Sequence, residues 1–310
     1  MNQVRINHVM SQDIPSNILT SFIGYLQQSD RNHSHEVSIE PIDGCDVYHY
    51  HRPHLEKKLK KNSIVTVHHD LEESDPWLSL MSFINRYKEC SKVVCLNNIQ
   101  KKILEDYNID NTIVIPHGYN KTIFKREPRE FQNKKITLGL ISKRYGRRVK
   151  GEAYFYDLVK RLDQDLFDFI FVGEGRSIEH QFVKSLGFDS KVFERLPYRI
   201  FGDLYKKIDL LLMLSLYEGG PANIPEAVIS NVPVAAFNIG MVPDFISDGT
   251  NGLILTGDED VDAKTILNLA LEDNSYEKLL ASTCEYNKFV PSWEEVAELY
   301  SQVYNEVALI

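Results

Sequence analysis

The sequence predicts an α/β protein made of two doubly wound domains. Short apolar or β-branched runs recur along the chain, and a segment of helical periodicity follows most of them, which is typical of parallel βαβ units. At 310 residues the chain is too long for one ordinary hydrophobic core and suits two domains. A polar stretch over 119–135 has no clean period and contains Pro128, which predicts the connection between the two sheets.

Each predicted element rests on its local pattern. The first domain is expected to hold strands at 4–10, 36–42, 45–51, 63–69, 92–97 and 111–116. The second is expected to hold strands at 135–142, 167–173, 191–196, 209–215 and 233–238. Helical periodicity predicts helices at 17–28, 76–89, 98–107, 151–163, 177–186, 222–230, 261–272 and 292–307. These elements place the first domain at 1–120 and the second at 133–290.

Composition narrows the class of protein. The net charge of −9 disfavours a general nucleic-acid binder, which needs a basic surface. No apolar run is long enough to span a membrane, and MNQVRINHVM lacks the apolar core of a signal peptide, so a soluble cytoplasmic protein is expected. The four cysteines form no CxxC pair, and we expect neither a disulfide nor a cysteine metal site.

The stretch YEGGPANIPEAV, 217–228, places two carboxylates eight positions apart around a Gly-Gly-Pro turn. Glu218 follows an apolar strand and Glu226 lies on the next predicted helix, so both are expected to face one crevice beyond the carboxyl ends of the strands. A carboxylate accepts hydrogen bonds from vicinal hydroxyls, and glycines leave backbone N–H groups open to a ligand. The alternative is an ordinary βα loop with a first-turn glutamate placed for the helix dipole.

A basic stretch, KKITLGLISKRYGRRVKG at 134–151, carries seven basic residues and no acidic one. Positive charge before a helix N-terminus suits a diphosphate. The alternative is a solvated basic face or a patch for an anionic membrane. The nearby FVGEG, 171–175, ends a strand with Gly173 and Gly175 but lacks the third glycine of a dinucleotide fingerprint.

Histidine is concentrated in the first domain, with five of the ten between 49 and 69. His49 and His51 alternate on one strand and point the same way, which is the pattern of a metal half-site. With His69, and with Asp70 as a further ligand, they support a metal-dependent hydrolase as an alternative function. We prefer core or crevice-lining histidines, because no matched carboxylate set follows.

The segment 208–255 resembles the signature region of the retaining GT-B glycosyltransferases of family 4, the glycosyl transferases group 1. The matching residues, in order, are Asp209, Ser215, Glu218 to Pro221, Glu226, Ala227, Pro233, Val234, Gly240, Asp248, Gly249, Gly252 and Leu253. The sequence departs from the pattern at Leu214, where the family has proline, and at Asn231, where it has glycine. The resemblance implies two facing doubly wound Rossmann-like domains, the GT-B arrangement. The family's crossover helix is matched by PSWEEVAELYSQVYNEV, which would return 292–310 to the first domain.

The resemblance also implies roles for single residues. Glu226 would hold the ribose of a nucleotide sugar, while Glu218 with Gly219, Gly220 and Pro221 would hold the transferred sugar. Lys150 matches the family's phosphate-binding lysine, and Arg144 is the replacement expected for its arginine, with Lys143, Arg147 and Arg148 as competitors. Gly173 matches a donor-binding glycine. Leu196, Pro197 and Tyr198 match the segment that holds the base, and His69 ends a strand in the family's H-D pattern, near the reacting carbon.

The implied reaction moves a hexose from a donor such as a UDP- or GDP-hexose to an acceptor hydroxyl with retention, in cell-surface polysaccharide or glycoconjugate synthesis, and requires no metal or cofactor. The acceptor would be a glycan or a lipid-linked molecule. The basic run RPHLEKKLKKN, 52–62, allows peripheral contact with the inner face of the membrane, although a charge-rich helix end explains it as well. Rival functions are a GT-B nucleotide-sugar epimerase, the metal-dependent hydrolase, and a sugar-nucleotide binder without catalysis.

Overall fold

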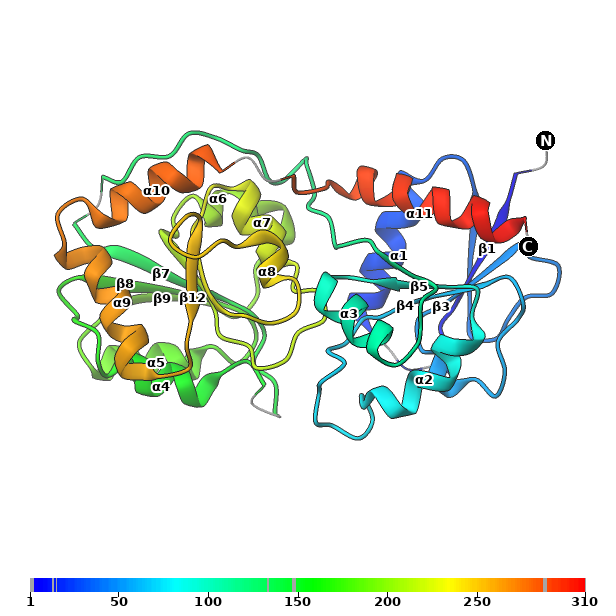
Figure 1. Cartoon of the computed structure of the whole chain (residues 1–310). Coiled ribbons are helices and arrows are strands. Elements are labelled where there is room, and N and C mark those ends of the chain that lie inside the picture. The colour runs from blue at the N-terminus through cyan, green and yellow to red at the C-terminus, as the bar shows by residue number, and fades with distance from the viewer. Residues whose placement is uncertain are drawn as a thin grey trace. The chain divides into compact units, whose positions relative to one another are not determined.

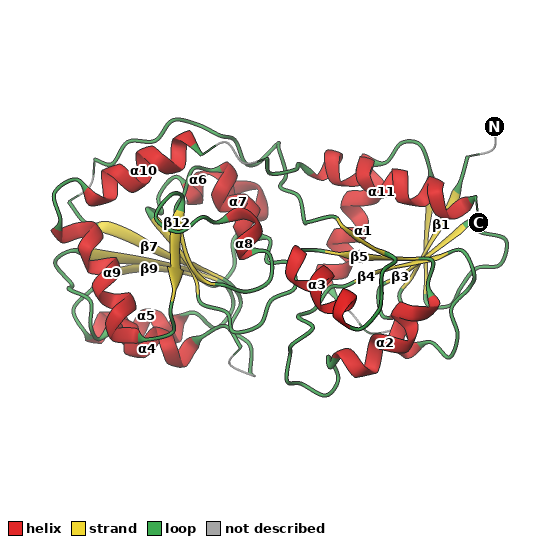
Figure 2. Cartoon of the chain, in the orientation of Figure 1, coloured by secondary structure: helices red, strands yellow, loops and turns green. Residues whose placement is uncertain are grey.

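The computed structural model describes residues 3–12, 14, 16–132, 134–146, 149–286 and 289–309 (Figure 1). The chain divides into two compact units, each an α/β structure (Figure 2). Unit 1 comprises 1–118, 217–221 and 291–310, and unit 2 comprises 119–216 and 222–290. Within the described residues, none of the helices is both long and apolar enough to cross a bilayer.

Unit 1 contains a six-stranded sheet in the order β2-β1-β3-β4-β5-β6. All its strand pairs are parallel, so the carboxyl ends of the strands share one edge. The order reverses between β1 and β3, and such a switch point opens a crevice beyond the strand ends. The strands are β1 (Arg5–Val9), β2 (Ser34–Ser38), β3 (Val47–Tyr50), β4 (Ser63–Thr66), β5 (Lys92–Cys95) and β6 (Thr112–Val114).

Helices cover this sheet because each presents an apolar stripe to it. They are α1 (Asn17–Ser29), the 3-10 turn η1 (Pro53–Leu55), α2 (Leu80–Glu89), α3 (Asn98–Asp106) and α11 (Trp293–Ala308). The last helix begins with a capping box between Ser292 and Glu295 and buries Trp293, whose ring stacks on Tyr25 of α1 at 4.6 Å between centroids. The C-terminal helix therefore belongs to the core of unit 1.

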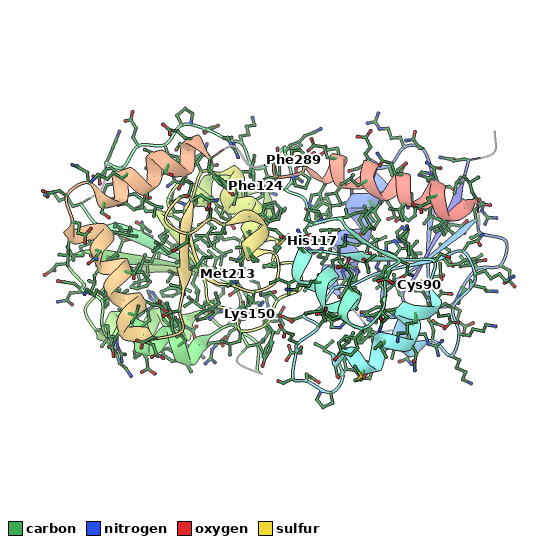
Figure 3. The ribbon with its side chains drawn as sticks, in the orientation of Figure 1. Cys90, His117, Phe124, Lys150, Met213 and Phe289 are labelled. Carbon is green, nitrogen blue, oxygen red and sulfur yellow. The ribbon has the colours of Figure 1, made fainter. Side chains whose placement is uncertain are left out.

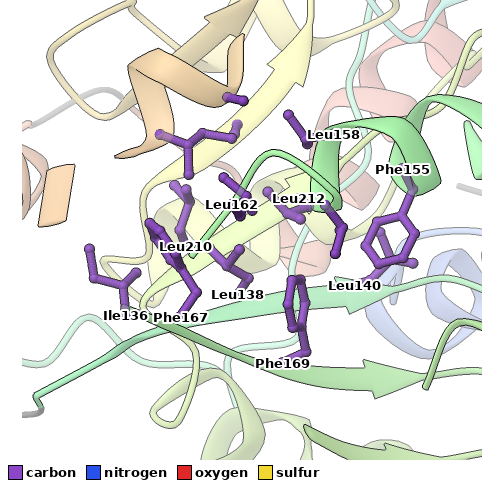
Figure 4. Close-up of a cluster of buried hydrophobic side chains, with 14 of the residues drawn as sticks. Ile136, Leu138, Leu140, Phe155, Leu158, Leu162, Phe167, Phe169, Leu210 and Leu212 are labelled. Carbon is purple, nitrogen blue, oxygen red and sulfur yellow. The ribbon is translucent and has the colours of Figure 1, made fainter. Parts of the chain in front are cut away.

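Unit 2 contains a second six-stranded parallel sheet, in the order β12-β11-β10-β7-β8-β9. The strands are β7 (Ile136–Ile141), β8 (Phe167–Val172), β9 (Asp189–Phe193), β10 (Leu210–Met213), β11 (Val234–Phe237) and β12 (Gly252–Leu255). Their central members are apolar on both faces, as expected for a sheet covered by helices on each side. On one face of this sheet, Leu138, Phe169 and Leu212 pack in a cluster with Phe155, which lies on α4 (Glu152–Val159) (Figure 4).

The helices of unit 2 complete the doubly wound arrangement. They are α4 (Glu152–Val159), α5 (Ser177–Ser185), the 3-10 turn η2 (Tyr198–Ile200), α6 (Phe201–Tyr205), α7 (Asn223–Ile229), α8 (Val242–Phe245), α9 (Glu259–Leu271) and α10 (Ser275–Glu285). The prediction of two doubly wound α/β domains is thereby confirmed. Strand β12 and helices α8 and α10 were not expected from the sequence, and β2 begins two residues earlier than predicted.

Candidate active site

The loops that follow β7 and β10 meet at the switch point of the unit 2 sheet, where β7 lies beside β10. The amide of Leu216 donates to the carbonyl of Val149 at 2.9 Å. Gly151 lies so close to β10 that an added Cβ would stand 1.9 Å from the carbonyl oxygen of Leu214, and its φ of +75° also favours glycine. The end of the basic stretch, at Val149 to Gly151, is thus held against the end of β10.

Glu226 is the buried carboxylate of this site. It lies in the first turn of α7 and is 4% exposed. Tyr198 donates its phenol to Oε1 at 2.6 Å, and Tyr205 donates to Oε2 at 2.9 Å. Each carboxylate oxygen can accept more than one hydrogen bond, so both retain capacity for ligand hydroxyls.

The surroundings of Glu226 oppose ionisation. Burial raises the pKa of Glu226 to about 7, against the lowering effect of the hydrogen bonds from Tyr198 and Tyr205. The carboxyl group therefore exchanges its proton near neutral pH. A ligand that donates two hydroxyl hydrogen bonds would favour the ionised form.

The turns that follow β7 and β8, at Ser142 and Gly173, contact each other. Gly173 has φ of +133°, and a Cβ there would lie 2.4 Å from the carbonyl oxygen of Ser142. The buried guanidinium of Arg176 donates through Nε to the same carbonyl and through Nη2 to the Ser142 hydroxyl, both at 2.7 Å. Glycine is needed at this position because backbone atoms fill the space of a side chain.

The predicted phosphate-binding cations differ in their surroundings. Arg144 donates from Nε to Glu179 Oε1 at 3.1 Å, and the side chain of Glu179 is fully buried. Lys143 pairs with Glu174 at 3.1 Å. Lys150, labelled in Figure 3, lies two residues before the start of α4, with its ammonium 5.4 Å from the centre of the Tyr145 ring. Arg147 and Arg148 lie outside the described residues.

The Glu218 loop, residues 217–221, is part of unit 1, whereas Glu226 is part of unit 2. The amide of Glu218 donates to Asp70 Oδ2 at 3.0 Å, and the amide group of Asn97 donates to the carbonyl of Gly219 at 2.6 Å. Pro221 is buried and Gly220 lies against His117, whose Nδ1 an added Cβ would meet at 3.2 Å. The backbone of the loop is therefore fixed by side chains of the first domain.

His69 lies beside the same loop but turns its ring into an apolar environment. A Cβ on Gly219 would meet the backbone of His69 at 3.0 Å, while the imidazole packs against Phe83 with 4.2 Å between ring centres. Nε2 is buried and has no hydrogen-bond partner among the described residues. Burial lowers the pKa of His69 to about 4. The ring is thus neutral at physiological pH.

The predicted metal set His49, His51 and His69 is wrong in its third member. Among the described residues, the histidines whose ring nitrogens converge are His8, His49 and His51. The packing of His69 against Phe83 explains why it takes no part.

Two residues that shape these loops, Tyr205 and Asn97, were missed from the sequence. Tyr205 lies 21 positions before Glu226, and Asn97 lies 122 positions before Gly219, so only the fold brings these pairs together. Asn97 did carry a local signal, because its side chain caps α3 by accepting from the amide of Gln100. Asp70 was considered as a metal ligand, and the structure shows it holding the amide of Glu218 instead.

Comparison with known proteins gives a family match and several structural neighbours. The family model described as Glycosyl transferases group 1 matches residues 120–301. An uncharacterised glycosyltransferase of Methanocaldococcus jannaschii is 25% identical over 284 residues, which are 86% of this chain and 77% of that protein. The poly(ribitol-phosphate) alpha-N-acetylglucosaminyltransferase of Staphylococcus aureus is 28% identical over 214 residues, 64% of this chain and 41% of that protein.

Solved structures share the fold at low sequence identity. HepE of Anabaena, solved in complex with UDP and glucose, has a TM-score of 0.73 at 14% identity, covering 98% of this chain and 100% of that chain. TarM of S. aureus, solved as a mutant with Fondaparinux, alpha-GlcNAc-glycerol and UDP, has a TM-score of 0.65 at 22% identity, covering 84% of this chain. The match spans 55% of TarM, about half of its length.

Proposed function

This chain belongs to the glycosyl transferases group 1 family, and from that premise we propose that it transfers a hexose from a nucleotide-sugar donor to an acceptor hydroxyl with retention of configuration. The single observation that carries the proposal is the geometry of Glu226. A buried carboxylate held by two phenols at a parallel-sheet switch point is suited to a ribose diol, which donates two hydrogen bonds at fixed spacing.

The donor diphosphate needs positive charge and backbone N–H groups beyond β7 and β8. The turn at Gly173 lies against the backbone of Ser142, just after β7, and Lys150 precedes the N-terminus of α4, where Gly151 lies against Leu214. We propose Lys150 as the main cation for the leaving diphosphate. Arg144 is a weaker candidate because its guanidinium already pairs with the buried Glu179.

The transfer step conserves atoms without a protein nucleophile. The acceptor oxygen forms a bond to the anomeric carbon as the bond between that carbon and the diphosphate oxygen breaks. The acceptor proton passes to the departing phosphate oxygen on the same face of the sugar. Lys150 and backbone N–H groups stabilise the negative charge that develops on the diphosphate.

The Glu218 loop is proposed to position the transferred sugar. Its backbone is fixed by Asp70 and Asn97, so the Glu218 carboxylate starts from a defined place. His69 is proposed to lie near the transferred sugar without carrying a charge, since its pKa is lowered to about 4.

Donor identity is proposed from the relatives. HepE and TarM were both solved with UDP, so a UDP-hexose or UDP-N-acetylhexosamine is the first donor to test. The Staphylococcus relative acts on poly(ribitol-phosphate), which supports a cell-surface polyol or glycan as the acceptor class.

The proposal is tested by incubating the protein with UDP-, GDP-, ADP- and TDP-sugars, with and without a panel of glycan and polyol-phosphate acceptors. We expect release of one nucleoside diphosphate that depends on the acceptor, and a product whose anomeric proton coupling by NMR equals that of the donor. Conversion of the donor sugar into an epimer without an acceptor would replace the proposal with the epimerase alternative. An inverted anomeric centre would contradict retention alone.

A further inference from the structure

Histidines converge at the switch point of unit 1, in a part of the fold that the proposed transfer does not use. His8 on β1 and His49 on β3 are register partners on neighbouring strands. His51 follows His49 by two positions and lies on the same face. The exposed fractions of His8, His49 and His51 are 0%, 0% and 4%.

The ring nitrogens are already close to the spacing of a coordination sphere. His8 Nδ1 lies 3.1 Å from His51 Nε2, and one nitrogen from each of the three rings lies within 4.8 Å of the others. Tetrahedral zinc with bonds of about 2.0–2.1 Å separates its ligands by about 3.3 Å. We propose that His8, His49 and His51 bind one divalent transition-metal ion of the zinc class as the first unit folds.

The partners of these rings support the assignment, because a ligating histidine usually donates its second ring N–H to a fixed acceptor. His8 Nε2 lies 2.9 Å from His35 Nδ1, and His35 Nε2 lies 3.2 Å from Asp30 Oδ2. His51 Nδ1 lies 3.1 Å from His68 Nε2. The outer nitrogens of two ligands are therefore already held.

His49 has a hydroxyl at each ring nitrogen. Nδ1 lies 2.9 Å from Tyr304 Oη, and Nε2 lies 2.8 Å from Thr66 Oγ1. One nitrogen can turn to the metal while the other keeps its hydroxyl, and Tyr304 is a candidate oxygen neighbour of the ion. Binding one ion requires the three ring nitrogens to approach one another by up to about 1.5 Å, the difference between the present limit of 4.8 Å and a tetrahedral edge.

The donor chemistry selects the ion and its role. Three neutral imidazoles suit Zn²⁺ and Co²⁺ rather than Mg²⁺ or Ca²⁺, which prefer carboxylate and carbonyl oxygens. Because the rings are buried, the ion would hold β1 to β3 rather than activate water for a substrate. This role differs from the hydrolase alternative, in which the metal must be open to substrate.

The competing account is a metal-free hydrogen-bonded chain. In that account each N–H points toward Asp30, and His51 Nε2 donates to His8 Nδ1. The two accounts differ at the contact between His8 and His51, where either a proton or an ion lies, and at His49, which keeps both hydroxyl contacts only without the ion. Metal content therefore decides between them.

The test uses the full chain produced in zinc-supplemented medium, with any affinity tag removed, and measures zinc by elemental analysis. We expect about one ion per chain after dialysis and a lower unfolding temperature after removal with a chelator, because an ion bound only to the folded state stabilises it. Protein produced with Co²⁺ instead should show the visible absorption of tetrahedral cobalt. Protein without zinc, without cobalt absorption and with an unchanged unfolding temperature would overturn the proposal in favour of the hydrogen-bonded chain.

Three variants sharpen the result. His35→Gln removes a partner of His8 without removing a ligand, and we expect the same stoichiometry with about 10–100-fold weaker zinc binding. His180→Gln is the matched control, since His180 lies in unit 2 and contacts Ser190. It should retain metal as the parent protein does, and an equal loss of zinc in both variants would place the ion elsewhere. His51→Gln should lose the ion, and if that variant does not fold, the wild-type cobalt spectrum still decides.

Discussion

The phenol of Tyr205 donates a hydrogen bond of 2.9 Å to Oε2 of Glu226, and both residues are buried in unit 2. The contact joins α6 to the first turn of α7 and sets the direction of the carboxylate. A buried acceptor that loses its donor costs free energy unless water replaces it. The proposed ribose site therefore depends on a residue that no ligand needs to touch.

Tyr205→Phe tests this dependence. We expect the free energy of unfolding to fall by about 1–3 kcal/mol, because Oε2 of Glu226 loses its donor in a buried environment. Chemical denaturation measures the change. Tyr198→Phe is the matched control: the residue is 36% exposed, so water can replace its phenol and the loss of stability should be smaller. Equal losses in the two variants would contradict the account.

The pH dependence of stability follows from the raised pKa of Glu226. Burial raises this pKa to about 7 from a model-peptide value of 4.5. Below pH 4.5 the carboxyl group of Glu226 is protonated in both the folded and the unfolded state, and the free energy of unfolding does not depend on its titration. As pH rises from 4.5 through 7 the group ionises first in the unfolded chain, which lowers the free energy of unfolding by up to about 3 kcal/mol.

Glu226→Gln isolates that contribution. The free energy of unfolding, measured by chemical denaturation between pH 4.5 and 8, should decline more steeply with pH for the parent protein than for the variant, whose residue 226 does not ionise. The difference between the two proteins should be concentrated between pH 4.5 and 7. Parallel curves would mean that Glu226 ionises as it does in the unfolded chain.

The fold was largely predictable because parallel strands leave strong local patterns. The run DLLLMLS predicts a buried strand, and β10 forms there as Leu210–Met213. Strand β12 was missed because it is only four residues long and begins with a glycine, Gly252. Helix α10 was not predicted, although Tyr276, Leu279 and Leu280 of SYEKLLASTCE recur at helical spacing and pack into the core.

The site was predictable only where a motif is contiguous. The pair Glu218 and Glu226 is visible in one stretch, whereas the contacts of Glu226 with Tyr205 and of Gly219 with Asn97 depend on tertiary structure. The position of His69 at a strand end was visible in the sequence. The direction of its ring was not, because packing against Phe83 of α2 determines it. Local patterns thus locate loops, and packing decides where their side chains point.

Asn97→Ser tests the anchoring of the Glu218 loop. Serine keeps a cap for α3 but loses the amide that donates to the carbonyl of Gly219. We expect kcat to fall about fivefold, since one hydrogen bond is worth about 1 kcal/mol, with little change in donor KM. Steady-state kinetics provide the measurement. A rise in KM alone would assign the loop to donor binding rather than to sugar positioning.

Lys150 and Arg144 can be ranked by substitution. Lys150→Ala should lower kcat/KM more than Arg144→Ala, because the Arg144 guanidinium is already shared with Glu179. If Lys150 stabilises the leaving diphosphate, its loss should appear mainly in kcat. A greater effect of Arg144 would show that this arginine leaves Glu179 when the donor binds.

The most direct measurement of the central claim is calorimetric titration of UDP into the parent protein, Glu226→Gln and Glu218→Gln at pH 8, where the Glu226 carboxyl is mostly ionised. We predict that Glu226→Gln weakens UDP binding by about 10–100-fold, through the loss of charge-assisted hydrogen bonds to the ribose. Glu218→Gln should bind UDP as the parent does, since UDP lacks the transferred sugar. Unchanged UDP affinity in Glu226→Gln, with the parent binding UDP normally, would contradict the assignment of Glu226 to the ribose.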